Sequence, residues 1–355
     1  MYVDLVETVA AAFAPSGRAL SAFANGSLAF NSKVSGVPDL LLTLTTSTLG
    51  GASGDRSQRI RSLMQRPVFH PCVRLARWTQ HGELSFVPPD GRFVLAGYEV
   101  DLLGPGSDTG LGPEASKLNL PVTARVTTGL GQAGNEFEVR LELSPRFSNS
   151  SGRGHGPRGV GSSSSAPSVS SSGFGSDYKA PVLEELKCFI PLPTSAVRRI
   201  PDLRPSRGEA HFSPAEGGIM WTFSPKVAGQ MTAATLRCSV VGHNSGVDDD
   251  ETNGNTSLAA GGYAYDDGED GGAYQTPRDS SPAPESEAKR RAANAALMPR
   301  CVSISFAVKG WLASGLRVDS LTIDTKRSRG LGEGVKPYKG VKYLTVSRGG
   351  VEVRC

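Results

Sequence analysis

Short runs that alternate between apolar and polar residues dominate the chain. Residues 137–143 (Phe-Glu-Val-Arg-Leu-Glu-Leu) alternate strictly, and 302–308 and 318–323 follow the same period of two. Because neighbouring side chains of a strand point to opposite faces, this period predicts half-buried β-strands. Turn-forming residues separate such runs, at Pro15-Ser16-Gly17, Asn25-Gly26 and Pro89-Asp90-Gly91. The pattern predicts an all-β protein built from antiparallel β-sandwiches.

The last alternating run, within residues 336–346, also carries concentrated positive charge. Between Lys326 and Arg354 there are eight Lys or Arg residues and two acids. Val341, Tyr343 and Thr345 are expected on one face of this strand, and the residues between them on the other. We therefore expect function to lie on this strand, although a solvated edge strand would show a similar pattern.

Two low-complexity segments interrupt the β pattern. Residues 148–177 are mostly Ser and Gly, and residues from about 244 to 296 are acidic and then rich in Pro, Ser and Ala. Neither can bury enough apolar area to offset the entropy of ordering, so both are predicted to be disordered loops. Residues 288–298 have helical composition, and only a transient helix is expected there.

The charge distribution narrows the range of partners. The net charge is +4, but residues 248–270 hold eight acids and no base, so the remainder of the chain stands at +12. This excess favours an anionic membrane surface or an acidic partner. Without a basic helix, an aromatic RNA-binding pattern or zinc-finger spacing, it does not favour nucleic acid.

The sequence has no motif that predicts catalysis, a cofactor or a metal. Residues 129–134 match G-x-G-x-x-G, but a strand follows them where a dinucleotide site needs a helix, so a hairpin turn is expected. The five histidines are far apart, and the five cysteines form no C-x-x-C pair and are expected to be buried and reduced. The missing catalytic motifs predict a protein that is not an enzyme. No apolar stretch is long enough for a membrane span or flanked like a signal peptide, which predicts a cytoplasmic protein.

Six runs together, in order and spacing, carry a resemblance to a known family: Tyr2–Glu7, Ser35–Leu40, Phe69–Arg74, Leu84–Gly91, Ser314–Val318 and Gly340–Tyr343. They resemble the mu homology domain of the medium chains of clathrin-adaptor-type complexes. The phrase Ser-Phe-Val-Pro-Pro-Asp-Gly at 85–91 is highly specific to that family. Gly340, together with the run Pro-Tyr-Lys-Gly that it ends, looks most like the mu chain of adaptor protein complex 3. The plasma-membrane and trans-Golgi mu chains typically carry tryptophan at that position.

The resemblance implies an elongated pair of antiparallel β-sandwich subdomains, the second inserted into the first. The first subdomain would comprise about 1–108 and 309–355, and the second about 109–308, including both low-complexity segments. Family members also carry an N-terminal longin-like domain, which is expected to be absent here. The strands at the two ends of the sequence would then share one sandwich.

The resemblance also implies a function, namely recognition of Tyr-x-x-Φ sorting motifs in cytosolic tails of membrane proteins, where Φ is a bulky apolar residue. Such a tail would add to a sheet edge, expected at 341–346, by β-augmentation. The family's basic residue on the third strand aligns with Asn31, and Lys33 is expected to substitute. Carried over by position, the tyrosine pocket would comprise Tyr2, Asp4, Lys33, Gly340 and Lys342. The hydrophobic pocket would comprise Val3, Val318, Leu321 and Val341.

The implied partners are the other adaptor subunits, which are two large chains and a small sigma chain, and an anionic membrane. The expected location is cytoplasmic and peripheral on Golgi, endosomal or vesicle membranes, in transport to the late endosome, lysosome or vacuole. An alternative is a structural coat subunit or lipid-contacting module whose motif site has decayed. A secreted carbohydrate-binding sandwich also fits the β pattern, but the absent signal peptide and disulfides disfavour it.

Overall fold

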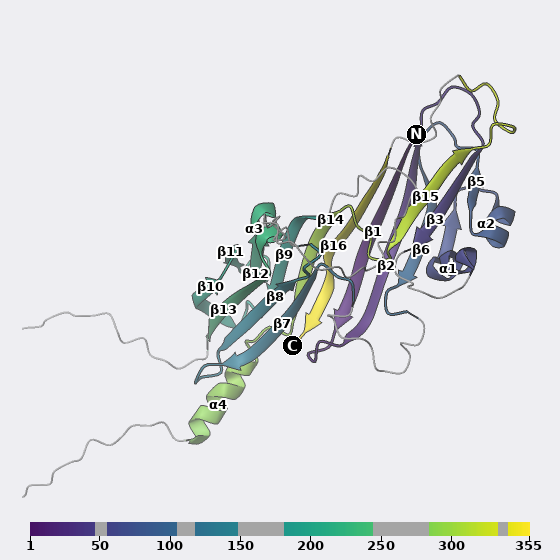
Figure 1. The fold of residues 1–355 in the computed structure, drawn as a ribbon. Coiled ribbons are helices and arrows are strands. Elements are labelled where there is room, and N and C mark those ends of the chain that lie inside the picture. The colour runs from purple at the N-terminus through teal and green to yellow at the C-terminus, as the bar shows by residue number, and fades with distance from the viewer. Residues whose placement is uncertain (47–54, 105–117, 148–180, 244–283, 333–339) are drawn as a thin grey trace, which may run out of the picture.

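A computed structural model of the protein describes residues 1–46, 55–104, 118–147, 181–243, 284–332 and 340–355. Strands dominate these ranges, which confirms the predicted all-β class (Figure 1). The strands are β1 (Tyr2–Phe13), β2 (Ala19–Ser32), β3 (Leu40–Thr46), β4 (Gln65–Phe69), β5 (Leu84–Phe86), β6 (Gly91–Asp101), β7 (Val122–Leu130), β8 (Glu136–Leu143), β9 (Val182–Pro191), β10 (Val197–Pro205), β11 (Glu209–Ser213), β12 (Gly218–Phe223), β13 (Ala233–Gly242), β14 (Cys301–Lys309), β15 (Leu316–Ile323) and β16 (Val341–Arg354). The helices are α1 (Arg56–Leu63), α2 (Leu75–His81), α3 (Pro225–Gln230) and α4 (Pro284–Ala295).

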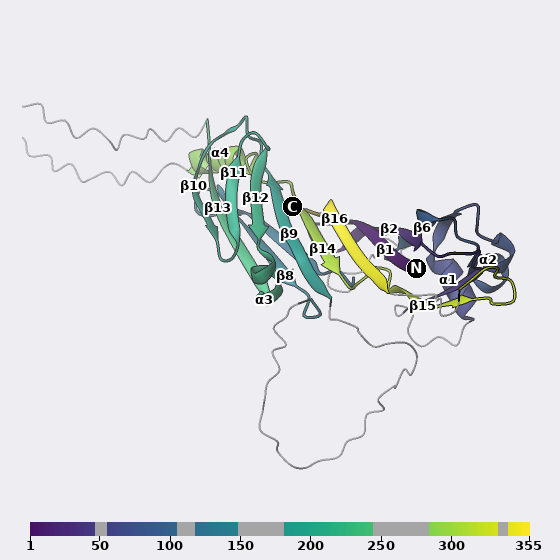
Figure 2. The same cartoon turned by 90° about the horizontal axis from the view of Figure 1, so that it is seen from above.

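One long sheet runs through the elongated molecule in the order β11-β12-β9-β14-β16-β1-β2-β6-β4 (Figures 1 and 2). Two smaller sheets accompany it, β15-β3-β5 towards one end and β10-β13-β8-β7 towards the other. The molecule therefore contains two sandwiches that share one sheet. β14 pairs directly with β16, so the long sheet continues from one sandwich into the other without a break. The subdomain boundaries expected near residues 108 and 309 therefore remain a prediction.

The first and last strands of the chain lie side by side. β1 pairs with β16 in parallel, with Val3 opposite Val341 and Asp4 opposite Lys342, and β2 flanks β1 on its other side. Along β1 the odd-numbered residues are buried, whereas Tyr2 and Asp4 belong to the more exposed face. This alternation is the period of two that the sequence pattern predicts.

Glu7 is the exception to this pattern, a carboxylate that is fully buried on the apolar face of β1. The Tyr98 hydroxyl donates a hydrogen bond to its Oε1 at 3.0 Å, and the backbone N–H of Ser314 donates to its Oε2, also at 3.0 Å. The Ser314 hydroxyl donates to Oε1 as well. Burial raises the pKa of the Glu7 carboxyl, although these hydrogen bonds act in the opposite direction.

Several predictions about individual elements are confirmed. Residues 137–143, 302–308 and 318–323 lie in β8, β14 and β15. The glycine-rich segment 129–134 covers the end of β7 and most of the turn of the β7–β8 hairpin, as expected. A turn lies at 15–17, and a bend at Asp90 directly precedes β6.

The turn predicted at Asn25-Gly26 is wrong, because both residues lie inside β2, opposite β1 and β6. The Tyr98 ring packs against the backbone of Gly26, and a Cβ atom at this position would collide with that ring. A glycine in a strand often marks such a close approach rather than a turn. The Asn-Gly pair, which predicted a turn, therefore reflects the close contact between Gly26 of β2 and Tyr98 of β6.

The second predicted insert extends too far towards the C-terminus, since residues 284–295 form α4. The side chains of Arg291 and Asn294 donate hydrogen bonds to the carbonyl oxygens of Gln132 and Ala133 in the β7–β8 turn. Leu297, just after the helix, is buried. The remaining residues of that insert, and the segment 148–177, lie outside the described residues.

Candidate functional site

Polar residues of the predicted tyrosine pocket come together on the exposed face of the long sheet. Asp4 and Lys342 are in-register partners of neighbouring parallel strands, so their side chains share a face. Tyr2, two residues before Asp4, lies on the same face and is 48% exposed. Gly340 directly precedes β16, and its carbonyl oxygen accepts a hydrogen bond from the Val3 N–H at 3.4 Å.

Arg92 is a residue of this face that sequence reasoning missed. It pairs in register with Asn31, which in turn pairs with Tyr2. Its Nη2 lies 3.5 Å from Oδ2 of Asp4, and the Arg92 and Asp4 side chains are 68% and 28% exposed. The ion pair is therefore long and open to solvent. No sequence signal identifies this residue, because only the pairing of β2 with β6 brings Arg92 near Asp4.

Asn31 and Lys33 do not complete the site in the expected way. The Oδ1 atom of Asn31 is buried and has no hydrogen-bond partner among the described residues. Lys33 lies just beyond the end of β2 at Ser32 and is exposed. No contact joins Lys33 to Asp4 in the described part of the chain, so its role stays a prediction.

The predicted hydrophobic residues come from the other side of β1 and β16 and from β15. Val3 is fully buried and pairs with Val341, which is partly buried. On β15, Leu321 is 4% exposed and Val318 is partly buried. The backbone N–H of Val318 donates to the Tyr343 hydroxyl at 3.1 Å, which ties β15 to β16. The two predicted pockets therefore lie on opposite faces of β16.

The open edge of β16 is shorter than expected. β14 pairs with Leu344–Val346, and the Gly310 N–H donates to the Tyr343 carbonyl at 2.8 Å. The expectation of an edge over the whole of 341–346 is therefore wrong. The backbone N–H and C=O groups of successive residues point to alternate sides of a strand. Since the carbonyl of Gly340 points towards β1, the N–H and C=O of Val341 point away from β1. The edge is limited to the start of the strand.

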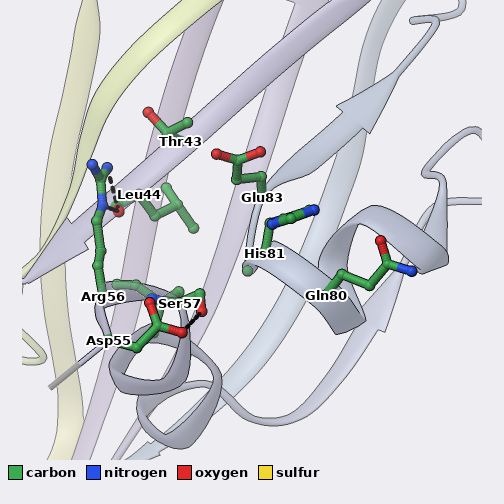
Figure 3. A pocket seen from close by; sticks show the side chains of 10 residues that line it. Thr43, Leu44, Asp55, Arg56, Ser57, Gln80, His81 and Glu83 are labelled. Atoms are coloured by element: carbon green, nitrogen blue, oxygen red, sulfur yellow. Dashed lines mark hydrogen bonds between the residues drawn. The ribbon is translucent and has the colours of Figure 1, made fainter.

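A separate pocket of about 270 Å³ lies between β3, α1 and the end of α2 (Figure 3). Its polar side chains are largely paired within the fold. Arg56 donates to the Leu44 carbonyl at 2.9 Å and pairs with Asp319 at 2.8 Å. Asp55 caps α1 by accepting from the Ser57 N–H at 3.1 Å. None of the predicted site residues lines this pocket.

Comparison with known proteins identifies the family to which this chain belongs. The model of the adaptor complexes medium subunit family matches residues 1–355, so the chain belongs to that family. The AP-3 complex subunit mu of Eremothecium gossypii is 27% identical over 354 residues, 97% of this chain and 55% of that protein. The AP-3 complex subunit mu of Arabidopsis thaliana is 37% identical over 103 residues, 29% of this chain and 21% of that protein.

A solved-structure comparison gives the same fold. A homology model of the full-length AP-3 complex in an intermediate open conformation matches with a TM-score of 0.54 and 20% identity, over 100% of this chain and 68% of that chain. These findings confirm the resemblance to the AP-3 mu subunits, and that the chain is an adaptor medium subunit rather than an enzyme. This chain spans about half the length of the Eremothecium relative. Within the described ranges, no helix has the length and apolar character of a membrane span.

Proposed function

We propose that this domain selects membrane-protein cargo by binding Tyr-x-x-Φ tails at the start of β16. The supporting observation is the backbone of Val341, which pairs with no strand on the side away from β1 among the described residues. The Asp4–Lys342 pair lies on one face of this position, and Val3, Val318 and Leu321 lie towards the other. In an extended peptide, residues three positions apart point to opposite faces. A tail that adds as a strand beside Val341 would therefore direct its tyrosine and its Φ residue to different groups.

Asp4 accepts the hydrogen bond of the phenol in this proposal. The aliphatic part of Lys342 lies along the ring and keeps its ammonium near the hydroxyl. Arg92, already 3.5 Å from Asp4, supplies the second cation in place of a basic residue at position 31. Gly340 leaves one side of the tyrosine pocket without an aromatic wall, so tyrosine contacts should be weaker than in relatives with tryptophan there.

The expected affinity is modest. A hydrogen bond from the phenol to ionised Asp4 contributes roughly 1.5–3 kcal/mol, and burial of Φ a similar amount. Ordering of the tail opposes these terms by several kcal/mol. A net binding free energy of about −8 kcal/mol, which is micromolar affinity, is the natural scale.

Such a weak site suits an assembly with several simultaneous contacts. We infer that the partners are two large adaptor chains, a small sigma chain and an anionic membrane, and that transport leads from Golgi or endosomal membranes to the lysosome or vacuole. The AP-3 names of the relatives support this assignment.

Calorimetric titration tests the proposal. A peptide with one Tyr-x-x-Φ motif should bind the wild-type chain with micromolar affinity, and the same peptide with Tyr replaced by Ala should not. Asp4→Ala should abolish binding of the intact peptide. Arg348→Ala, which removes an exposed charge further along β16, is the matched control and should bind normally. A flat isotherm for the wild type would favour the structural coat role instead.

A further inference from the structure

Two of the four residues of the proposed Φ pocket lie on β15, a strand of the smaller β15-β3-β5 sheet. Val318 and Leu321 belong to β15, whereas Val3 and Val341 belong to β1 and β16 of the long sheet (Figure 1). The pocket therefore has one wall from each sheet. Its width depends on how β15 is held against β1 and β16.

An irregularity in β15 turns both of its pocket residues the same way. Val318 and Leu321 are three positions apart, which in a regular strand would place them on opposite faces. Their partners in β3 are the buried Leu44 and Leu42, only two positions apart, because the register shifts between Val318 and Ser320. A bulge of this kind re-aims side chains and is common beside functional sites. It directs Val318 and Leu321 towards the buried side of the small sheet.

A buried hydrogen-bonded link holds the start of β15 to β1. Glu7 is fully buried and accepts hydrogen bonds from the backbone N–H of Ser314, at 3.0 Å, and from the hydroxyl of the same residue. The Ser314 hydroxyl oxygen in turn accepts from the N–H of Leu316, the first residue of β15, at 3.1 Å. Glu7 lies on the same face of β1 as Val3. Its carboxyl group therefore fixes β15 against the strand that supplies the buried wall of the pocket.

A second link holds β15 to β16. The Tyr343 hydroxyl accepts a hydrogen bond from the Val318 N–H at 3.1 Å. Tyr343 follows Val341 by two positions and shares its face, so this hydrogen bond joins one wall of the pocket to the other. A partly buried N–H that loses its acceptor costs free energy. Both links therefore resist a shift of β15 away from the long sheet.

We propose that these two links set the width of the Φ pocket. Glu7 and Tyr343 are thus positioning residues for the selection of Φ, an inference that rests on the proposed function because it concerns the same site. The pocket residues are all aliphatic, and two of them are at most 4% exposed. A closely packed aliphatic wall accepts a branched aliphatic side chain more readily than a larger ring, which would force the wall to move. With β15 fixed, the site should prefer Leu to Phe at Φ.

Calorimetric titration of the full chain with two peptides that differ only at Φ tests the inference. The wild type should bind Tyr-x-x-Leu on the order of tenfold more tightly than Tyr-x-x-Phe. Tyr343→Phe removes one link and Ser314→Ala weakens the other. Each variant should lower the preference about threefold, because β15 then yields more easily to the larger ring.

Tyr98→Phe is the matched control. It removes a buried hydroxyl that donates to Glu7 from β6 at 3.0 Å, but it leaves both links to β15 in place, so the preference for Leu should not change. An unchanged preference in both link variants would overturn the inference. An equal loss in Tyr98→Phe would also overturn it, because it would point to a loosened core, and so would a wild type that binds both peptides equally.

Amide hydrogen exchange of the free chain separates this inference from the proposed function. The Val318 amide should exchange faster in Tyr343→Phe than in the wild type, and equal exchange would count against the link. Flat wild-type isotherms with both peptides would instead overturn the proposed function. Faster exchange at Val318 would then still support the anchoring of β15 by Tyr343.

Discussion

Single residues decide how the proposed motif site is charged. Asp4 is flanked by Lys342 in the neighbouring strand and by Arg92 from two strands away. Sequence comparison supplied Asp4 and Lys342, because both belong to contiguous runs that resemble the family. It placed the second cation at Lys33, since Arg92 becomes a neighbour of Asp4 only when β6 pairs with β2.

The role of Arg92 can be isolated with a double-mutant cycle. We expect Arg92→Gln to weaken binding of a Tyr-x-x-Φ peptide by roughly 1 kcal/mol, below the usual range for charged hydrogen bonds because the side chain is exposed. The same change should not affect a peptide with Phe in place of Tyr, since that ring has no hydroxyl. Lys33→Gln is the control and should leave both affinities unchanged. A larger effect for Lys33→Gln would assign the cation to that residue.

Glu7 predicts a pH dependence of stability. Its pKa is raised above the ordinary value of 4.5 in the folded chain, chiefly by burial. The folded state then binds more protons than the unfolded state above that pH, so the Glu7 contribution to stability is fully present below about pH 4.5 and declines as pH rises through the folded-state pKa. Urea unfolding of wild type and Glu7→Gln should show the variant gaining relative stability as pH rises. Parallel pH curves for the two proteins would contradict this.

Among the secondary-structure elements, the local alternation of apolar and polar residues predicted the positions of strands. It did not predict which strands pair or which elements pack together. β8, β14 and β15 lie where the period of two placed them. The edge of β16 was predicted too long, because only the fold shows that β14 pairs with it from Leu344 onwards. The buried end of α4 was missed for a similar reason: the contacts of Asn294 with the β7–β8 turn are long-range. Composition alone cannot show that a polar helix has a docking partner.

Gly26 gives an element-scale prediction. Gly26→Ala would force the Tyr98 ring away and disturb its hydrogen bond to Glu7, so we expect a loss of roughly 1–3 kcal/mol in the free energy of unfolding. Gly97→Ala in the paired strand β6 is the matched control, since the nearest atom to its added Cβ would be 4.0 Å away. Chemical denaturation of both variants provides the measurement. Equal stabilities would show that the Tyr98 contact is easily rearranged.

At the scale of the whole molecule, the long sheet links the two sandwiches through β14 and β16. The resemblance predicted that the ends of the chain share a sandwich, and the parallel β1–β16 pairing agrees. The continuity of the sheet could not be predicted, since strand order depends on pairings between distant segments. At one end, this arrangement places the start of β16 beside β1.

In the proposed function, a tail adds as a strand at the start of β16. Amide hydrogen exchange by NMR, with and without a Tyr-x-x-Φ peptide, tests this most directly. We predict that the bound peptide slows exchange of the Val341 amide, which faces the open side, and leaves the edge strand β4 unchanged. A peptide that binds without protecting Val341, or that protects β4 instead, would show that the tail does not add at the start of β16.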